Sequence, residues 1–233
     1  MSVITEDAVE GPAPCRLSVF WASTVGKKLV MALSGLILFA YVFAHMLGNM
    51  QIYLGSEVIN RYARFLHSNE GMLWTARIVL LAAVLVHAIA GIQLWVRKRE
   101  ARPIPYRTKE NIQASAASRT MIWTGAIIAV FVVYHVLDLT LGVARAVPYR
   151  DLDPAFNVAE DFTQVPAALA YIGAMIALGF HLWHGVYSMF GTLGLDHPGY
   201  IAGIKRAAAL IATLIALANI SIPVAVLTGL LRG

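Results

Sequence analysis

The sequence predicts an all-α integral membrane protein with five transmembrane helices, and three observations lead to this fold class. Of the 233 residues, 59% are hydrophobic and only 13% are charged, whereas a soluble domain averages roughly 45–50% apolar and about 25% charged residues. The mean hydropathy is +0.69. The apolar residues also gather in five long runs. These features argue against a soluble enzyme, a nucleic-acid-binding protein and a disordered chain.

The first segment of the chain precedes the apolar runs. Residues 1–27 begin with acidic and proline residues and then mix basic with apolar side chains. We expect an N-terminal tail that leads into either a short interfacial helix or an unstructured segment. No apolar stretch precedes Leu29, which argues against a secretory signal peptide. The remainder, residues 28–233, is expected to form one transmembrane domain.

Five apolar segments follow, joined by short connections. Each is long enough to form a membrane-spanning helix, which takes about 20 residues. The connection over residues 143–165, as long as any of the others, contains four acidic residues and is the segment that we expect to cap the surface. The predicted spans cover residues 29–50, 72–96, 120–142, 166–190 and 204–231.

The basic residues predict the orientation of the chain. If the N-terminus is cytoplasmic, 12 Lys and Arg residues fall on the cytoplasmic side and six on the outer side. Cytoplasmic loops carry an excess of Lys and Arg, so we expect the N-terminus in the cytoplasm and the C-terminus outside. Cys15 is the single cysteine, which excludes an internal disulfide, a CxxC metal site and an iron–sulfur cluster.

Histidines inside the predicted spans are the strongest functional signal. An ionisable side chain inside a membrane is costly and marks a functional site by default. One such histidine is as often a hydrogen-bonded packing residue as a ligand, but four consecutive spans each supply one. The histidines within spans are His45, His87, His135, His181 and His184, whereas His67 and His197 fall in predicted loops.

Depth in the membrane groups four of these histidines into two pairs. At 1.5 Å per helical residue, His45 and His135 lie about 26 and about 24 Å from the inner side, and His87 and His181 both lie about 15 Å from it. Two imidazoles at one depth on facing helices can ligate a haem iron from both sides. Two such levels about 10 Å apart along the membrane normal would form an electron path across the membrane.

Other uses of the histidines lack partner residues. A zinc or di-metal centre would require nearby carboxylates or cysteines, and a proton pump would require a chain of acids at mid-depth. Asp138 is the only acid well inside a predicted span, and it lies in the outer third. These observations favour haem over a protein-only metal centre.

Five stretches in order carry a further signal: KLVMALSGLILFAYVFAHMLGN (28–49), NRYA (60–63), RIVLLAAVLVH (77–87), YHVLDLTLG (134–142) and FHLWHGVYSMFGTLG (180–194). Together they resemble the membrane cytochrome b subunits of succinate dehydrogenase and fumarate reductase, of the single-chain, five-helix, two-haem type. The resemblance covers nearly the whole chain except the N-terminal tail and residues 143–165.

The resemblance implies that His45, His87, His135 and His181 are the axial ligands of two haem b groups in a di-haem domain over residues 28–233. His184 would then be a neighbour of the ligand, or replace His181 in that role. Some fumarate reductases of this type carry a proton-transferring glutamate two residues before the fourth-helix ligand. The corresponding residue here is Gly179, which puts that proton route in doubt.

The resemblance also implies a complex in a bacterial cytoplasmic membrane. A flavoprotein subunit would oxidise succinate, and an iron–sulfur subunit would pass the electrons to this chain. The chain would deliver them to a quinone, which we expect to be menaquinone. The basic connection over residues 97–119 would suit docking of these subunits, although positive-inside bias alone also explains it.

Residues near the ends of the spans are candidates for binding the haem propionates. These carboxylates need cations or hydroxyl donors where water is scarce. Arg77 lies near the level of the outer haem and is the candidate there; snorkelling of its side chain to the surface is the alternative. Lys28 and Ser34 are candidates for the inner haem.

Reduction of a quinone takes two electrons and two protons, so a quinone site needs a proton donor beside a haem. Asp138 follows His135 by three residues, on the same helix face, and Glu70 lies at the mouth of the second span. Both are candidates for an outer quinone site. Asp138 could instead pair with Arg77 or Arg145 in a structural role, and an inner quinone site near the iron–sulfur subunit remains open.

Two other functions are compatible with the sequence. One is the haem b subunit of a different membrane dehydrogenase, such as a hydrogenase or a formate dehydrogenase. The other is a haem-free membrane anchor or transporter whose histidines only pack. A reduced-minus-oxidised spectrum separates the haem proteins from the last class, and co-purification of a flavoprotein separates the first two.

Overall fold

The computed structural model describes residues 16–101 and 115–231 of the chain. Over this part every regular element is helical, and five helices are long and apolar enough to cross a membrane. The predicted all-α fold class with five spans is therefore confirmed. These helices are α2 (Thr24–Met50), α4 (Glu70–Glu100), α5 (Ala116–His135), α7 (Val165–Thr192) and α8 (Ile201–Leu227). Residues 1–15 of the predicted N-terminal segment and most of the basic connection over residues 97–119 lie outside the described residues.

Side-chain caps explain why three of the spans begin earlier than predicted. Ser23, Asn69 and Ser115 each accept a hydrogen bond from a backbone N–H three residues later, at 2.8, 3.0 and 3.1 Å. Such caps satisfy N–H groups that the helix leaves without partners. The polar first turns of α2, α4 and α5 are therefore helical, although they do not belong to the apolar runs.

Three shorter helices accompany the spans: α1 (Arg16–Ala22), α3 (Ser56–His67) and α6 (Pro154–Phe162). The prediction that His67 lies in a loop is wrong, because His67 is the last residue of α3, which also contains residues 60–63. This helix is amphipathic, with Ile59 buried and most of its polar residues exposed, so a search for long apolar runs does not detect it. Gly55, at φ 111°, turns the chain into α3.

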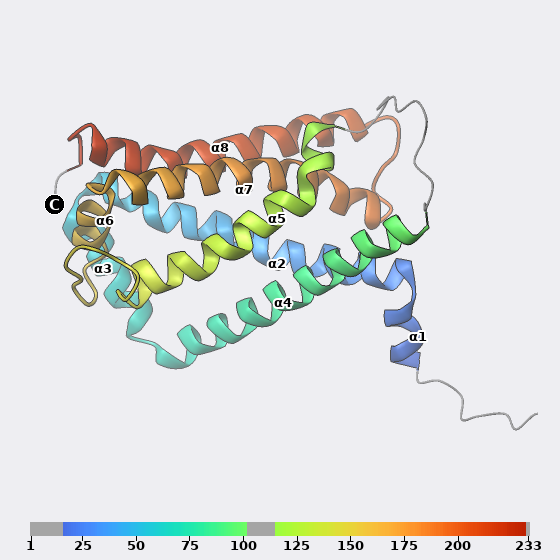
Figure 1. Ribbon diagram of the computed structural model, residues 1–233, viewed down its shortest axis with the longest axis horizontal. Coiled ribbons are helices and arrows are strands. Elements are labelled where there is room, and N and C mark those ends of the chain that lie inside the picture. Colours follow the sequence, from blue (N-terminus) through green and yellow to red (C-terminus); the bar gives the residue numbers. More distant parts are fainter. Residues whose placement is uncertain (1–15, 102–114, 232–233) are drawn as a thin grey trace, which may run out of the picture.

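The long helices form a bundle in which α2 packs on α4 and on α7, α5 packs on α7, and α8 packs on α7. Figure 1 shows α7 and α8 side by side along their length. Helices α3 and α6 lie together at one end of the bundle, which we call the cap end. Helix α1 lies at the opposite end, which we call the tail end.

At the cap end, α5 finishes in a π-helical turn over Val136–Thr140. Such turns are rare and are found often at functional sites. The turn places Asp138 in the interior, where none of its surface is exposed. A cluster of buried apolar side chains packs around this end, among them Ile59 of α3, Phe162 of α6 and Tyr171 of α7. The predicted surface cap over residues 143–165 thus contains a helix that is partly buried against the bundle.

Candidate functional site

The four histidines grouped by depth meet in the same two pairs in the structure. The rings of His45 and His135 lie 5.8 Å apart between centroids at 83° to each other, near the cap end. The rings of His87 and His181 lie 6.2 Å apart at 60°, towards the tail end. We call these the cap-end pair and the tail-end pair. The His184 ring instead contacts Tyr187, so it is His181 that meets His87.

Each pair joins helices on opposite sides of the bundle. The cap-end pair comes from α2 and α5, and the tail-end pair comes from α4 and α7. Neither combination is among the helix pairs that pack closely over the described residues, whereas α2 with α4 and α5 with α7 are. The imidazoles therefore face the axis of a four-helix arrangement, with α8 packed outside it against α7.

Hydrogen bonds orient both rings of the tail-end pair. His87 Nδ1 lies 3.1 Å from the carbonyl oxygen of Met31 and 3.3 Å from Ser34 Oγ. His181 Nδ1 lies 3.3 Å from Thr124 Oγ1. Each partner comes from the helix packed against the histidine's own helix, α2 in the first case and α5 in the second. Ser34, predicted to bind a propionate, thus contacts a histidine of the tail-end pair.

The same contacts determine which nitrogen carries the proton. The Ser34 hydroxyl donates to the Val30 carbonyl at 2.7 Å, and the Thr124 hydroxyl donates to the Thr120 carbonyl at 3.1 Å. A hydroxyl has one proton to donate, so towards the histidines both oxygens act as acceptors. Nδ1 is then the protonated nitrogen of each ring, and the Nε2 lone pair is free to bind a metal.

Glycines beside these hydroxyl residues allow the close approach. A Cβ built on Gly35 would lie 3.1 Å from His87 Cε1, and one on Gly125 would lie 3.4 Å from His181 Cε1. A hydroxyl residue followed by glycine therefore supports each ring of the tail-end pair. The sequence signal for this arrangement is a Ser-Gly and a Thr-Gly dipeptide, each inside an otherwise apolar span.

The cap-end pair is held differently. His135 Nδ1 lies 3.3 Å from the hydroxyl of Tyr171, which donates its proton to Asp138 Oδ2 at 2.7 Å. The tyrosine oxygen therefore accepts from His135, which again leaves Nε2 free. The His45 ring stacks on Tyr41, with centroids 5.4 Å apart and the planes at 13°.

Both pairs fit a haem iron held by two axial imidazoles. A bond between a metal and an imidazole nitrogen measures about 2.0–2.1 Å, so two such bonds place the ligating nitrogens about 4 Å apart and the ring centres farther apart still. The centroid separations of 5.8 and 6.2 Å are compatible with that spacing. No group of three or more His, Cys, Asp or Glu side chains that could hold a metal ion occurs in the described part of the chain. A cofactor that supplies its own equatorial ligands suits this donor set.

The predicted propionate residues differ in where they lie. The Arg77 guanidinium stacks over the Trp74 ring at 5.0 Å and lies within electrostatic reach of Tyr41, which stacks on His45. Arg77 is therefore near the cap-end pair. Lys28 is exposed and, among the described residues, makes no polar contact with either pair. Its neighbour Lys27 is buried, with Nζ donating to the Trp21 carbonyl at 2.8 Å.

The two predicted quinone residues also differ. Glu70 is exposed at the start of α4. Asp138 is fully buried, and over the described residues it forms no ion pair with Arg77 or Arg145. Besides Tyr171, Asp138 has Asp161 of α6 as a neighbour. Burial and the charge of Asp138 raise the pKa of the Asp161 carboxyl from 3.8 to about 6. Sequence reasoning missed Asp161 and Tyr171.

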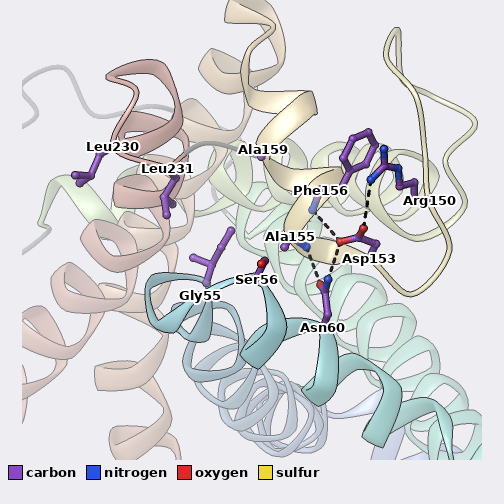
Figure 2. A pocket seen from close by; sticks show the side chains of 11 residues that line it. Gly55, Ser56, Asn60, Arg150, Asp153, Ala155, Phe156, Ala159, Leu230 and Leu231 are labelled. Atoms are coloured by element: carbon purple, nitrogen blue, oxygen red, sulfur yellow. Dashed lines mark hydrogen bonds and ion pairs between the residues drawn. The ribbon is translucent and has the colours of Figure 1, made fainter.

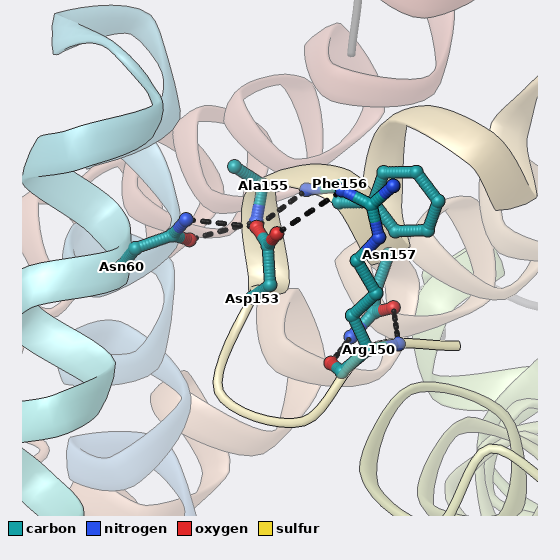
Figure 3. A network of polar contacts seen from close by, with 6 residues as sticks. All are labelled: Asn60, Arg150, Asp153, Ala155, Phe156 and Asn157. Atoms are coloured by element: carbon teal, nitrogen blue, oxygen red, sulfur yellow. Dashed lines mark hydrogen bonds and ion pairs between the residues drawn. The ribbon is translucent and has the colours of Figure 1, made fainter. Parts of the chain in front are cut away.

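A polar network docks α6, the helix that contains Asp161, on α3 (Figure 3). Asn60 donates to Asp153 Oδ1 at 2.8 Å and accepts from the Ala155 N–H at 3.1 Å. Asp153 caps α6 by accepting from the Phe156 N–H at 3.1 Å. The network borders a surface pocket of about 370 Å³ between α3, α6 and the end of the chain that follows α8, which Figure 2 shows.

Comparison with known proteins gives one match. The family model described as succinate dehydrogenase/fumarate reductase transmembrane subunit matches residues 97–220. No curated protein and no solved structure matches the chain.

Proposed function

Because the chain belongs to the succinate dehydrogenase/fumarate reductase transmembrane subunit family, we propose that it is the cytochrome b membrane anchor of such an enzyme. In this proposal an iron–sulfur subunit passes electrons to the chain, which carries them through two b haems to a quinone. The chain does not itself oxidise succinate. Family membership favours this function over the haem b subunit of a hydrogenase or a formate dehydrogenase.

The observation that carries the proposal is the hydrogen bonding of three histidine rings. His87, His181 and His135 each have Nδ1 beside an oxygen that accepts a hydrogen bond. Packing histidines have no need to keep Nε2 free beside a second imidazole across the bundle. We assign His87 and His181 to one haem, and His45 and His135 to the other.

The protein's part in electron transfer is to hold the haems and to orient the histidines that would bind them. A b haem supplies one-electron chemistry at its iron. Ser34 and Thr124 fix the rings of the tail-end pair, and Tyr171 fixes His135. Hydrogen bonds to Nδ1 make an imidazole a better ligand and help to set the redox potential. Arg77 is our candidate for a propionate of the cap-end haem, and Lys28 for one of the other haem.

The positive-inside excess supports an N-terminus in the cytoplasm, so that the tail end faces the cytoplasm and the cap end faces outwards. The flavoprotein and iron–sulfur subunits would then dock at the tail end, in a bacterial cytoplasmic membrane. Electrons would pass from the tail-end haem to the cap-end haem. A haem at the cap end is needed only if the quinone accepts its electrons at that end. We therefore propose that the quinone, which we expect to be menaquinone, is reduced near the cap end.

Protons for the quinone would come from acids at that end. Asp138 has no exposed surface, so we propose that it delivers protons rather than contacting the quinone. Exposed Glu70 is the second candidate for a residue of the quinone site.

The test of this function is purification of the assembled complex from its membrane with a tagged chain. We expect a flavoprotein and an iron–sulfur protein to co-purify, and succinate-dependent quinone reduction. In the Asp138→Asn variant, both haems and succinate oxidation by an artificial dye should persist while quinone reduction falls severalfold. If neither subunit co-purifies with the tagged chain, the proposed function is refuted. Normal quinone turnover in the Asp138→Asn variant would show that Asp138 does not deliver the protons.

A further inference from the structure

Three buried polar atoms at the cap end lack hydrogen-bond partners in the described part of the chain. They are Asp138 Oδ1, Asp161 Oδ2 and Arg145 Nη1. Asp138 and Asp161 are only 0% and 2% exposed. Unsatisfied buried polar atoms are rare, and each costs about 1–3 kcal/mol. Two acids and a cation with free bonding capacity in one place indicate a function for the group rather than packing alone.

The two carboxyl groups lie beside each other. Asp161 is close enough to Asp138 for a hydrogen bond between the side chains when one of them is protonated. Two neighbouring carboxylates in a poorly solvated site resist ionising together, because their charges repel. Arg145 opposes this effect with its positive charge, and its other nitrogens are held by the carbonyls of Val147 and Asn157 at 3.2 and 2.8 Å.

The groups that face Asp161 come from several elements. They are Asp138 from the π turn, Arg145 from the following loop, Tyr134 from α5 and Tyr171 from α7. The only charged residues of α8 are Lys205 and Arg206, near its opposite end. The charged and histidine side chains of α3 are exposed: Glu57, Arg61, Arg64 and His67. Among the described residues, Arg145 is thus the one cation that acts on the carboxyl pair.

A hydrogen-bonded path leads from the pair towards the centre of the bundle. Asp138 Oδ2 accepts from the Tyr171 hydroxyl at 2.7 Å, and that hydroxyl lies 3.3 Å from His135 Nδ1. In the other direction Asp161 belongs to α6, which with the preceding loop forms the outer layer of the cap end (Figure 1). The pair therefore lies between surface water and the cap-end histidines.

We propose that Asp161 and Asp138 share a single proton in a buried binding site that exchanges with water at the cap-end surface and is linked through Tyr171 to the cap-end histidine pair. On uptake, surface water gives a proton to the carboxylate pair, and on release the proton returns to water. The link to the histidines can affect a redox reaction only if they hold a haem, and this part of the proposal rests on the proposed function.

The test of the proton site itself needs no haem. The infrared C=O stretch of protonated carboxylic acids would be followed against pH in the purified full-length chain. We expect a carboxyl that titrates near pH 6, absent from Asp161→Asn and retained in Asp151→Asn, which removes an exposed acid of the loop before α6. Identical titrations of the wild type and Asp161→Asn would overturn the proposal.

A second variant keeps both acids and changes only the neighbouring cation. Arg145 lowers the pKa of Asp161, so Arg145→Gln should move the infrared midpoint to higher pH. An unchanged or lower midpoint would contradict the proposal even if Asp161→Asn does not fold.

The link through Tyr171 has its own readout. If the cap-end pair holds a haem, the midpoint potential of that haem should depend on pH around pH 6 in the wild type. In Tyr171→Phe this dependence should weaken while the infrared titration persists, and equal dependence in both would refute the link. A chain that shows the infrared titration but contains no haem would refute the proposed function and leave the proton site standing.

Discussion

Replacing Thr124 by valine tests whether the hydroxyl beside His181 orients a haem ligand. Valine keeps the size and branching of threonine but cannot accept a hydrogen bond, so the His181 Nδ1–H loses the one partner that it has in the described part of the chain. Removing such a partner of a metal-binding histidine costs about 10- to 100-fold in metal affinity, equivalent to about 1.4–2.7 kcal/mol. We expect the loss of haem affinity in Thr124→Val to fall in this range.

The equivalent change at the other ring should be milder. His87 Nδ1 has two acceptors, and Ser34→Ala leaves the Met31 carbonyl in place at 3.1 Å. We therefore expect a loss of haem affinity of about 2- to 3-fold, at the lower end of the 0.5–1.5 kcal/mol of a typical hydrogen bond. Thr120→Val is the matched control, because its hydroxyl lies one turn earlier on α5 and bonds only to carbonyls of its own helix.

The assay is the rate at which each haem passes from the purified chain to an excess of a haem-scavenging protein. Thr124→Val should release the tail-end haem about 10- to 100-fold faster and leave the cap-end haem unaffected. Thr120→Val should behave as the wild type. Equal effects of the two threonine variants, or a larger effect of Ser34→Ala than of Thr124→Val, would refute the assigned roles.

Three further predictions concern the surroundings of the two pairs. Gly35→Ala should displace His87 and lower the content of the tail-end haem, whereas Gly125→Ala should be tolerated, because the added Cβ would lie 3.1 Å from the ring in the first case and 3.4 Å in the second; equal haem contents would contradict this. Burial raises the pKa of Asp161 to about 6, above its ordinary 3.8, so the folded chain binds this proton more tightly than the unfolded chain and the resulting stability is lost as the pH rises through 6. Asp161→Asn should therefore raise the apparent Tm by roughly 2–8 °C near pH 8, for about 1–2 kcal/mol after solvent screening, and have little effect near pH 3, below the ordinary pKa of 3.8; an equal shift at both pH values would contradict the assignment. Arg77→Leu should shift the midpoint potential of the cap-end haem and leave that of the tail-end haem unchanged. Unchanged potentials of both haems in a redox titration would show that Arg77 does not bind a propionate.

Much of the fold follows from the sequence because a bilayer imposes a simple requirement. A span must be apolar over about 20 residues, and this pattern identified all five long helices. Helix α6 has nine residues and α3 is amphipathic, so neither produces such a run. Their positions depend on contacts such as that of Asn60 with Asp153, which join segments far apart in the sequence.

The pairing of the histidines was also predictable, since the rise per residue of a helix is constant and depth follows from counting. What counting cannot supply is the direction in which each helix face points. The partners of the rings, such as Thr124 for His181 and Tyr171 for His135, depend on helix rotation and packing. The same limit applies to Asp161, which meets Asp138 only because α6 folds back over the bundle.

The measurement that tests the central claim most directly is the haem content of four single variants, determined from reduced-minus-oxidised optical spectra and electron paramagnetic resonance of the purified chain. The wild type should contain two low-spin b haems. His87→Ala and His181→Ala should lose one and the same spectral component, and His45→Ala and His135→Ala should lose the other. A chain without haem, or variants of His87 and His45 that lose the same component, would contradict the account.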